Sequence, residues 1–118
     1  MFDGDGQDQN CIIGRVQFPG TINSVEYIPG WTMSGATTNS RTFTLINKRT
    51  DGTGTTSVAS LALISGVNLT KGVSKVITIS AANAVVAPGD VLQWESLHVG
   101  TGLPDPGGQV VVQQAVTY

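Results

Sequence analysis

The sequence predicts an all-β fold: a single antiparallel β-sandwich, jelly-roll-like, with an extended N-terminal arm. Three observations lead to this fold class. Short segments rich in β-branched residues alternate apolar and polar side chains, glycine- and proline-containing turn signals separate them, and no helical period persists beyond one turn. A chain of 118 residues is the size of one domain, and it is long enough to bury a core without disulfides.

Roughly seven or eight short strands are expected, which is typical of an antiparallel sandwich or jelly roll. The dipeptide Asp51-Gly52 is a strong hairpin signal between two of them. Residues 31–34 form a further short stretch, and residues 81–87 hold either one helical turn or an extended link. The predicted strands are residues 11–18, 21–28, 41–47, 55–64, 73–80, 91–99 and 109–117.

The first ten residues predict an arm. They contain three Asp, two Gly and three amide side chains, so they neither favour a helix nor bury an apolar face. The predicted organisation is therefore an arm over residues 1–10 and a sandwich over residues 11–118. The aromatic residue of the arm is placed to fill a pocket on a partner, and its carboxylates to meet basic groups there. These candidate partner-binding residues are Phe2, Asp3, Asp5 and Asp8.

Charged residues make up 12% of the chain, and the formal net charge is −2. A surface coated with Thr, Ser, Gln and Asn can pack against protein without desolvating many ions. Nucleic-acid binding is not expected, because the densest basic group, Arg41, Lys48 and Arg49, is short and is followed by Asp51. No apolar run is long enough to span a membrane, and the acidic N-terminus does not resemble a signal peptide. We therefore expect folding in the cytoplasm of the producing cell and no membrane contact.

No residue pattern predicts catalysis, so we expect a protein that is not an enzyme and uses no cofactor or metal. The alternating carboxylates of the arm do not complete a calcium loop, because the glycine comes early and no Glu follows within reach. His98, the single histidine, has Ser96 and Glu95 nearby, but alternation places Glu95 on the opposite face and no nucleophile elbow accompanies them. A structural hydrogen bond from His98 is expected instead. Cys11, the single cysteine, is expected to be a small buried hydrophobic residue.

The two tryptophans separate two interpretations. Exposed together, Trp31 and Trp94 would form a platform on which a sugar stacks. Alternation within residues 91–99 instead turns Trp94 inward, so core packing is expected for it.

The most specific pattern lies in the C-terminal third. Residues 86–96 read VAPGDVLQWES, and residues 98–108 read HVGTGLPDPGG. Together with residues 39–48 and 51–55, this pattern resembles a family of small β-sandwich virion proteins of tailed bacteriophages, in which a GD-x-L-x-W-x-S-x-H-x-G-x-G-x-x-DPGG run precedes the last strand. The resemblance covers the chain from about Phe18 to Val112. The acidic arm does not match the family pattern.

The motif also has a physical interpretation of its own. The Pro88-Gly89-Asp90 turn leads into a strand, Trp94 fills the core, and His98 hydrogen-bonds the Gly/Pro loop that follows. Trp94 and His98 are therefore expected to be structural residues.

The resemblance implies a virion structural protein, most simply a capsid decoration (cement) protein. Its partner would be the major capsid protein or another virion protein on the surface of the assembled phage head, which it would stabilise by mass action. Self-association into a homotrimer through neutral or apolar strand faces would add avidity on a symmetric site. Such a protein is made in the host cytoplasm and ends in the virion. The alternatives are a tail or fibre-associated component, or a glycan-binding β-sandwich module.

Overall fold

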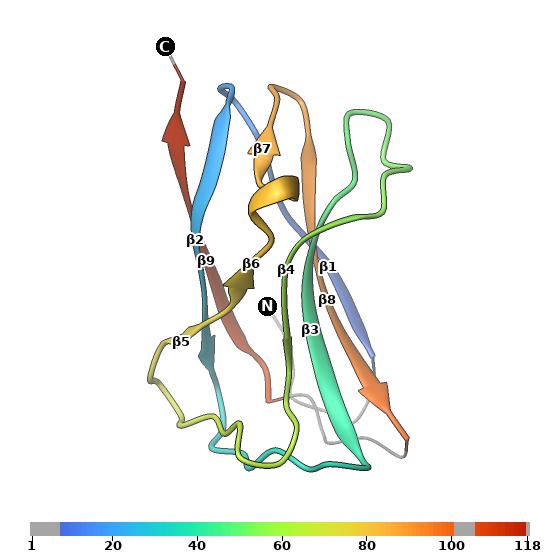
Figure 1. The fold of residues 1–118 in the computed structure, drawn as a ribbon, viewed down its shortest axis with the longest axis vertical. Coiled ribbons are helices and arrows are strands. Elements are labelled where there is room, and N and C mark those ends of the chain that lie inside the picture. Colours follow the sequence, from blue (N-terminus) through green and yellow to red (C-terminus); the bar gives the residue numbers. More distant parts are fainter. Residues whose placement is uncertain (1–7, 101–105, 118) are drawn as a thin grey trace.

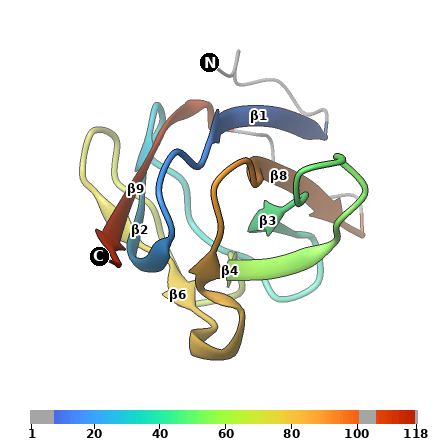
Figure 2. The same ribbon diagram turned by 90° about the horizontal axis from the view of Figure 1, so that it is seen from above.

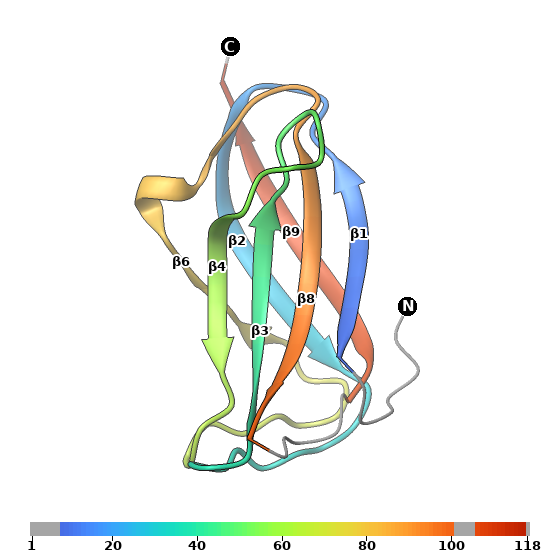
Figure 3. The ribbon, with the colours of Figure 1, turned by 90° about the vertical axis from the view of Figure 1, so that its right-hand side faces the viewer.

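The structure is a computed structural model that describes residues 8–100 and 106–117. Two antiparallel β-sheets pack face to face, one of five strands and one of four, which confirms the predicted all-β sandwich (Figures 1 and 2). In the view onto the face of the large sheet, strands β1, β8, β3 and β4 lie side by side in front and β2 and β9 lie behind them (Figure 3).

The five-stranded sheet, called here the large sheet, joins strands that are far apart in the sequence. Its strand β8 lies between β1 and β3, so the chain crosses between the two sheets before completing either of them. Such crossing connections are typical of Greek-key and jelly-roll sandwiches. In spatial order the large sheet contains β1 (Gln9–Arg15), β8 (Val91–Val99), β3 (Ser40–Asn47), β4 (Thr56–Ala62) and β6 (Thr78–Ile79).

The four-stranded sheet, called here the small sheet, is built around one long strand, β2 (Gly20–Pro29). Strand β9 (Gly108–Val116) pairs with β2 along its whole length. The other side of β2 carries two short strands, β5 (Lys75–Val76) and β7 (Val85–Val86). One long strand pair and two short pieces therefore make up this sheet.

Three aromatic rings fill the centre of the core. Tyr27 from β2 packs against both Phe43 of β3 and Trp94 of β8, with ring centroids 4.7 and 5.4 Å away, and the Phe43 and Trp94 centroids lie 5.6 Å apart, so each ring contacts the other two. All three side chains are fully buried, so the inward position predicted for Trp94 is confirmed. The burial of Leu92, Trp94 and Ser96 follows the strand period of two. Among the described residues, the Trp94 Nε1 atom has no hydrogen-bond partner.

The first strand differs from the prediction in its bounds. It begins at Gln9 and ends at Arg15, whereas residues 11–18 were expected. Gln9 and Asn10 were assigned to the arm because they are polar, but they pair with Ser96 and Glu95 of β8. Their polar side chains are compatible with a strand because the residues opposite them are also polar.

The prediction of one continuous strand over residues 73–80 is wrong. Residues 75–76 form β5 in the small sheet and residues 78–79 form β6 in the large sheet. Ile77, between them, is buried, and its N–H donates to the carbonyl of Val25 (2.9 Å). The β-branched run favours extended backbone locally, but the chain uses it to step from one sheet to the other.

The structure also shows what residues 81–87 and 31–34 form. Residues 81–87 contain both of the structures considered for them, the 3-10 turn η1 (Ala81–Asn83) followed by β7. The stretch at 31–34 makes a single bridge, between Met33 and Leu69.

The predicted hairpin at Asp51-Gly52 connects β3 to β4. The Asp51 Oδ1 atom accepts hydrogen bonds from the N–H and the hydroxyl of Thr53 (3.1 and 2.8 Å). These bonds, the backbone one first, favour the ionised carboxylate and hold the pKa of Asp51 below its ordinary value. Gly52 supplies the positive φ, +78°, that the turn requires.

Candidate functional site

Several loops and the start of β1 gather at one end of the sandwich, which we call the arm end. It lies at the bottom of Figure 1, where β8 ends and β3 begins. The link after β2 is held to the link before β9 there, because Gly30 N–H donates to the Gly107 carbonyl (3.2 Å). The hydroxyl of Tyr27 donates to the same carbonyl from the core. The end of β2 and the start of β9, the two long strands of the small sheet, are thus held together at this point.

Asp8, directly before β1, forms hydrogen bonds with His98 near the end of β8. Its Oδ1 atom accepts hydrogen bonds from the backbone N–H of His98 (2.8 Å) and from His98 Nδ1 (2.7 Å). An ionised carboxylate can only accept, so Nδ1 carries the hydrogen in this contact. Both side chains are partly exposed, with 38% of Asp8 and 48% of His98 accessible. His98 therefore makes a hydrogen bond, and its partner among the described residues is Asp8; residues 101–105 of the Gly/Pro loop lie outside the described residues, so a bond from His98 to them stays a prediction.

Arg41 lies beneath this pair and is fully buried. Its Nη1 atom donates to the carbonyl and to the hydroxyl of Ser96 (3.0 and 2.9 Å), and it lies 3.8 Å from Asp8 Oδ1. The residue was expected to belong to a short basic group with Lys48 and Arg49. In the structure they are separated, because Arg41 is the second residue of β3 and Lys48 and Arg49 follow the end of that strand.

A signal for the burial of Arg41 was present in the sequence. Arg41, Phe43 and Leu45 occupy alternate positions on one strand and share one face, and Phe43 and Leu45 are apolar. A cation on that face must be paired or solvated. The sequence did not indicate which carboxylate would lie near Arg41, because Asp8 is 33 positions earlier in the chain.

Asp8, Arg41, Ser96 and His98 form a polar cluster that joins the start of β1 to β8 and β3, and we call this cluster the latch. The hydrogen bonds from the backbone and ring of His98, in that order, and then the nearby charges hold the pKa of Asp8 below its ordinary value. The hydroxyl of Ser96 is buried and bonded to Arg41, and the ring of His98 is bonded to Asp8, so Ser96 and His98 are not arranged as nucleophile and base. Within the described ranges, no group of three or more His, Cys, Asp or Glu side chains could hold a metal ion.

The other predicted site residues divide into two sets. Phe2, Asp3 and Asp5 lie outside the described residues, so their expected contacts with a partner stay predictions. Asp8 is engaged within its own chain, which the sequence did not indicate. Cys11 is partly buried on β1, opposite Trp94.

The two tryptophans do not form a platform. Trp94 is fully buried, whereas Trp31 is 64% exposed beyond the end of β2. Among the described residues, a second strongly exposed aromatic side chain is Phe18, at 62%; it precedes β2 and so lies at the opposite end of the sandwich. In the described part of the chain, the aromatic pair that a sugar would stack on is therefore missing.

The outer face of the large sheet offers a different surface, broad and almost uncharged. Arg15, Arg41 and Glu95 are the formal charges in its five strands, and Arg41 is buried while Arg15 lies at a corner. Hydroxyl groups lie side by side across β3 and β4, with Thr44 Oγ1 3.5 Å from Ser60 Oγ. Residues on this face include Ile12, Thr42, Thr44, Ile46, Ser60, Gln93, Glu95 and Leu97.

In residues 8–100 and 106–117, no helix has the length and apolar character needed to cross a membrane. No protein-family model matches the chain, and comparisons with curated proteins and with solved structures found no match.

Proposed function

We propose that this chain is a non-enzymatic virion structural protein of a tailed bacteriophage, a capsid decoration protein that binds the assembled head. The observation that carries the proposal is the neutral outer face of the large sheet. A face with a single central carboxylate, Glu95, can be covered by another protein while few ions lose their hydration. The sequence resemblance supplies the virion context.

The alternative of a glycan-binding module has less support. It would need aromatic side chains exposed together, but Trp94 belongs to the core and Trp31 and Phe18 lie at opposite ends. The rival location, in a tail or fibre, would use the same neutral face and is distinguished by imaging.

The partner is the major capsid protein or another head protein, and residues 1–7 supply a second contact next to the latch. Asp8 bonds to His98, so the position to which residues 1–7 are joined is held against β8. Phe2 would then fill an apolar pocket on the partner, and Asp3 and Asp5 would orient the approach through basic groups there.

The test measures occupancy on phage heads by electron cryomicroscopy and mass per particle. Heads that lack the chain are incubated with the full-length protein, with a Gln93→Lys variant that puts a charge on the neutral face, and with a control, Asn23→Lys, that puts it on an exposed position of β2. We expect the full-length protein and the control to occupy the heads equally and Gln93→Lys to bind weakly. Absence of the chain from heads overturns the proposal, and density on the tail selects the rival location.

Removal of residues 1–7 tests the arm. The shortened chain keeps Asp8 and all of β1, so it should fold with an unchanged melting temperature. We expect it to occupy heads less than the full-length protein. Equal occupancy would place the attachment surface on the sandwich alone.

A further inference from the structure

The free edges of the two sheets differ in how well they are protected against pairing with another strand. Strands β5, β6 and β7 have two residues each, too few to template a partner. Strand β1 has seven, but its register shifts between Ile12 and Gly14 and it ends on a charge, Arg15. Such irregularities and charges are how natural proteins prevent edge-to-edge association.

Strand β9 has none of these protections of its own, because the extra residue at the register shift in the β2–β9 pair, Asn23, belongs to β2. It has nine residues, GQVVVQQAV, with no charge and no proline. In the described part of the chain it pairs with β2 alone, so its other edge presents unpaired backbone groups. A long, uncharged and regular edge of this kind is a surface for strand pairing.

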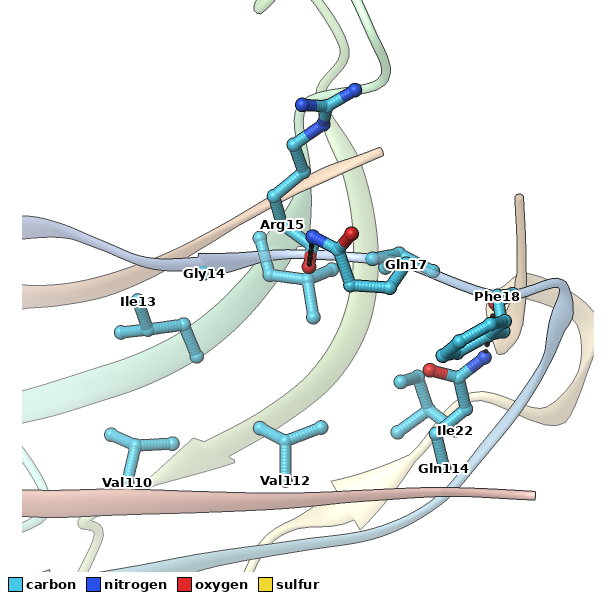
Figure 4. Close-up of a pocket in the computed structure, with 11 residues that line it drawn as sticks. Ile13, Gly14, Arg15, Gln17, Phe18, Ile22, Val110, Val112 and Gln114 are labelled. Atoms are coloured by element: carbon cyan, nitrogen blue, oxygen red, sulfur yellow. Dashed lines mark hydrogen bonds between the residues drawn. The ribbon is translucent and has the colours of Figure 1, made fainter. Parts of the chain in front are cut away.

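An apolar groove lies next to this edge, between the two sheets. It has a volume of about 510 Å³, and Figure 4 shows β1 along one wall and β9 along the other. Val110 and Val112 of β9 face Ile13 of β1 across the groove, with Ile22 and Leu92 deeper in the core. A strand added to the edge of β9 would place alternate side chains over this opening.

We propose that the edge of β9 binds the β9 edge of a second copy of this chain, in an antiparallel pair around a two-fold axis. In such a pair each side chain near the axis lies beside its own counterpart, so a charged strand would repel itself. β9 carries no charge, and it therefore fits itself better than the other long free edge, β1, does. The small sheets of the two copies become one continuous sheet.

The register follows from the length of the strand. Pairing all nine residues places Val112 opposite the partner's Val112 at the axis, and Val111 opposite the partner's Gln113. The grooves of both copies then meet, and each copy covers the exposed apolar wall of the other. A three-fold arrangement would need β9 to pair with a different long edge, and β1 is a poor one because of its register shift and Arg15.

The experiment uses three double variants of the full chain. Val111→Lys with Gln113→Lys places lysines opposite lysines across the axis. Val111→Lys with Gln113→Glu places each lysine opposite a glutamate in the same register. Val76→Lys with Val85→Lys, on β5 and β7, adds the same charge to the other side of the small sheet and serves as the control. Lys at position 111 also lies opposite Glu26 of β2, so the fold of the variants should be kept, and their melting curves check this.

Sedimentation and light scattering are measured up to ~1 mM protein. We expect a dimer of twice the chain mass of 12.2 kDa for the wild type, the control and the Lys/Glu variant. The Lys/Lys variant should dissociate with a constant at least about tenfold higher. A monomeric or trimeric wild type, or a Lys/Lys variant that dimerises like the control, overturns the proposal, and a Lys/Glu variant that fails to dimerise overturns the register. None of these outcomes depends on whether the protein binds phage heads.

Discussion

Two clusters of ionic and polar groups lie at opposite ends of the β3–β8 strand pair, and they bury opposite charges. At the arm end the buried member is a cation, Arg41, and its carboxylate Asp8 is partly exposed. At the far end the buried member is a carboxylate, Asp90, and its cation Arg49 is 47% exposed. In each cluster, hydrogen bonds rather than the ion pair satisfy the buried charge.

The two buried groups find different kinds of partner. Arg41 donates to the carbonyl and hydroxyl of one residue, Ser96. Asp90 Oδ2 accepts from Asn47 Nδ2 (3.0 Å) and from the N–H of Ala87 (2.9 Å). The long side chain of Arg41 therefore reaches from β3 to the neighbouring strand β8. The short side chain of Asp90 instead bonds to Ala87 within the turn that precedes β8. The comparison indicates that the buried member controls stability at each end, because burial raises the cost of losing a partner.

The largest effect is expected for Arg41→Ala. The change removes a fully buried side chain together with its bonds to Ser96, and leaves those oxygen atoms in the core without that donor. We expect the free energy of unfolding to fall by about 3 kcal/mol, measured by denaturant unfolding. Arg41→Met, which keeps most of the packing, should lose less. A loss below about 1 kcal/mol for Arg41→Ala would show that the buried cation is not the controlling member.

Asp90→Ala is the corresponding change at the other end. It removes the acceptor of two hydrogen bonds whose donors are buried or partly buried, so the expected loss is about 2 kcal/mol. The matched control is Arg49→Ala, which removes the exposed member of the same ion pair and should cost less than about 1 kcal/mol. If both variants lost the same stability, the ion pair rather than the hydrogen bonds would control this end.

The smallest effect concerns the pH dependence of the latch. The pKa of Asp8 is lower in the folded chain than in the unfolded one, so this residue stabilises the fold above its unfolded pKa of about 3.9, and the contribution is lost as the pH falls through the folded pKa. Melting temperatures of the wild type and Asp8→Asn should therefore differ at neutral pH and converge in acid.

His98→Gln is the companion variant in that series. It removes the ring contact with Asp8 but keeps the backbone N–H bond, so its melting temperature should fall less than that of Asp8→Asn. A gap between wild type and Asp8→Asn that persists unchanged at the lowest pH would contradict the latch.

Much of the sandwich could be predicted because strand signals are local. Alternation placed Trp94 in the core, and turn residues placed the hairpin at Asp51 and the start of β8 after Asp90. The same reasoning failed for residues 73–80, where β-propensity favours extended backbone but does not say which sheet receives it.

The fold class, the extent of most strands and the neutral composition of the surface could be predicted from the chain without its three-dimensional structure. These properties depend on neighbouring residues and on composition. The tertiary structure alone decided that Asp8 meets Arg41 and His98, and that β9 lies at an edge beside a groove. Both depend on which distant strands pair, and strand pairing is set by the burial of the whole core rather than by any local pattern.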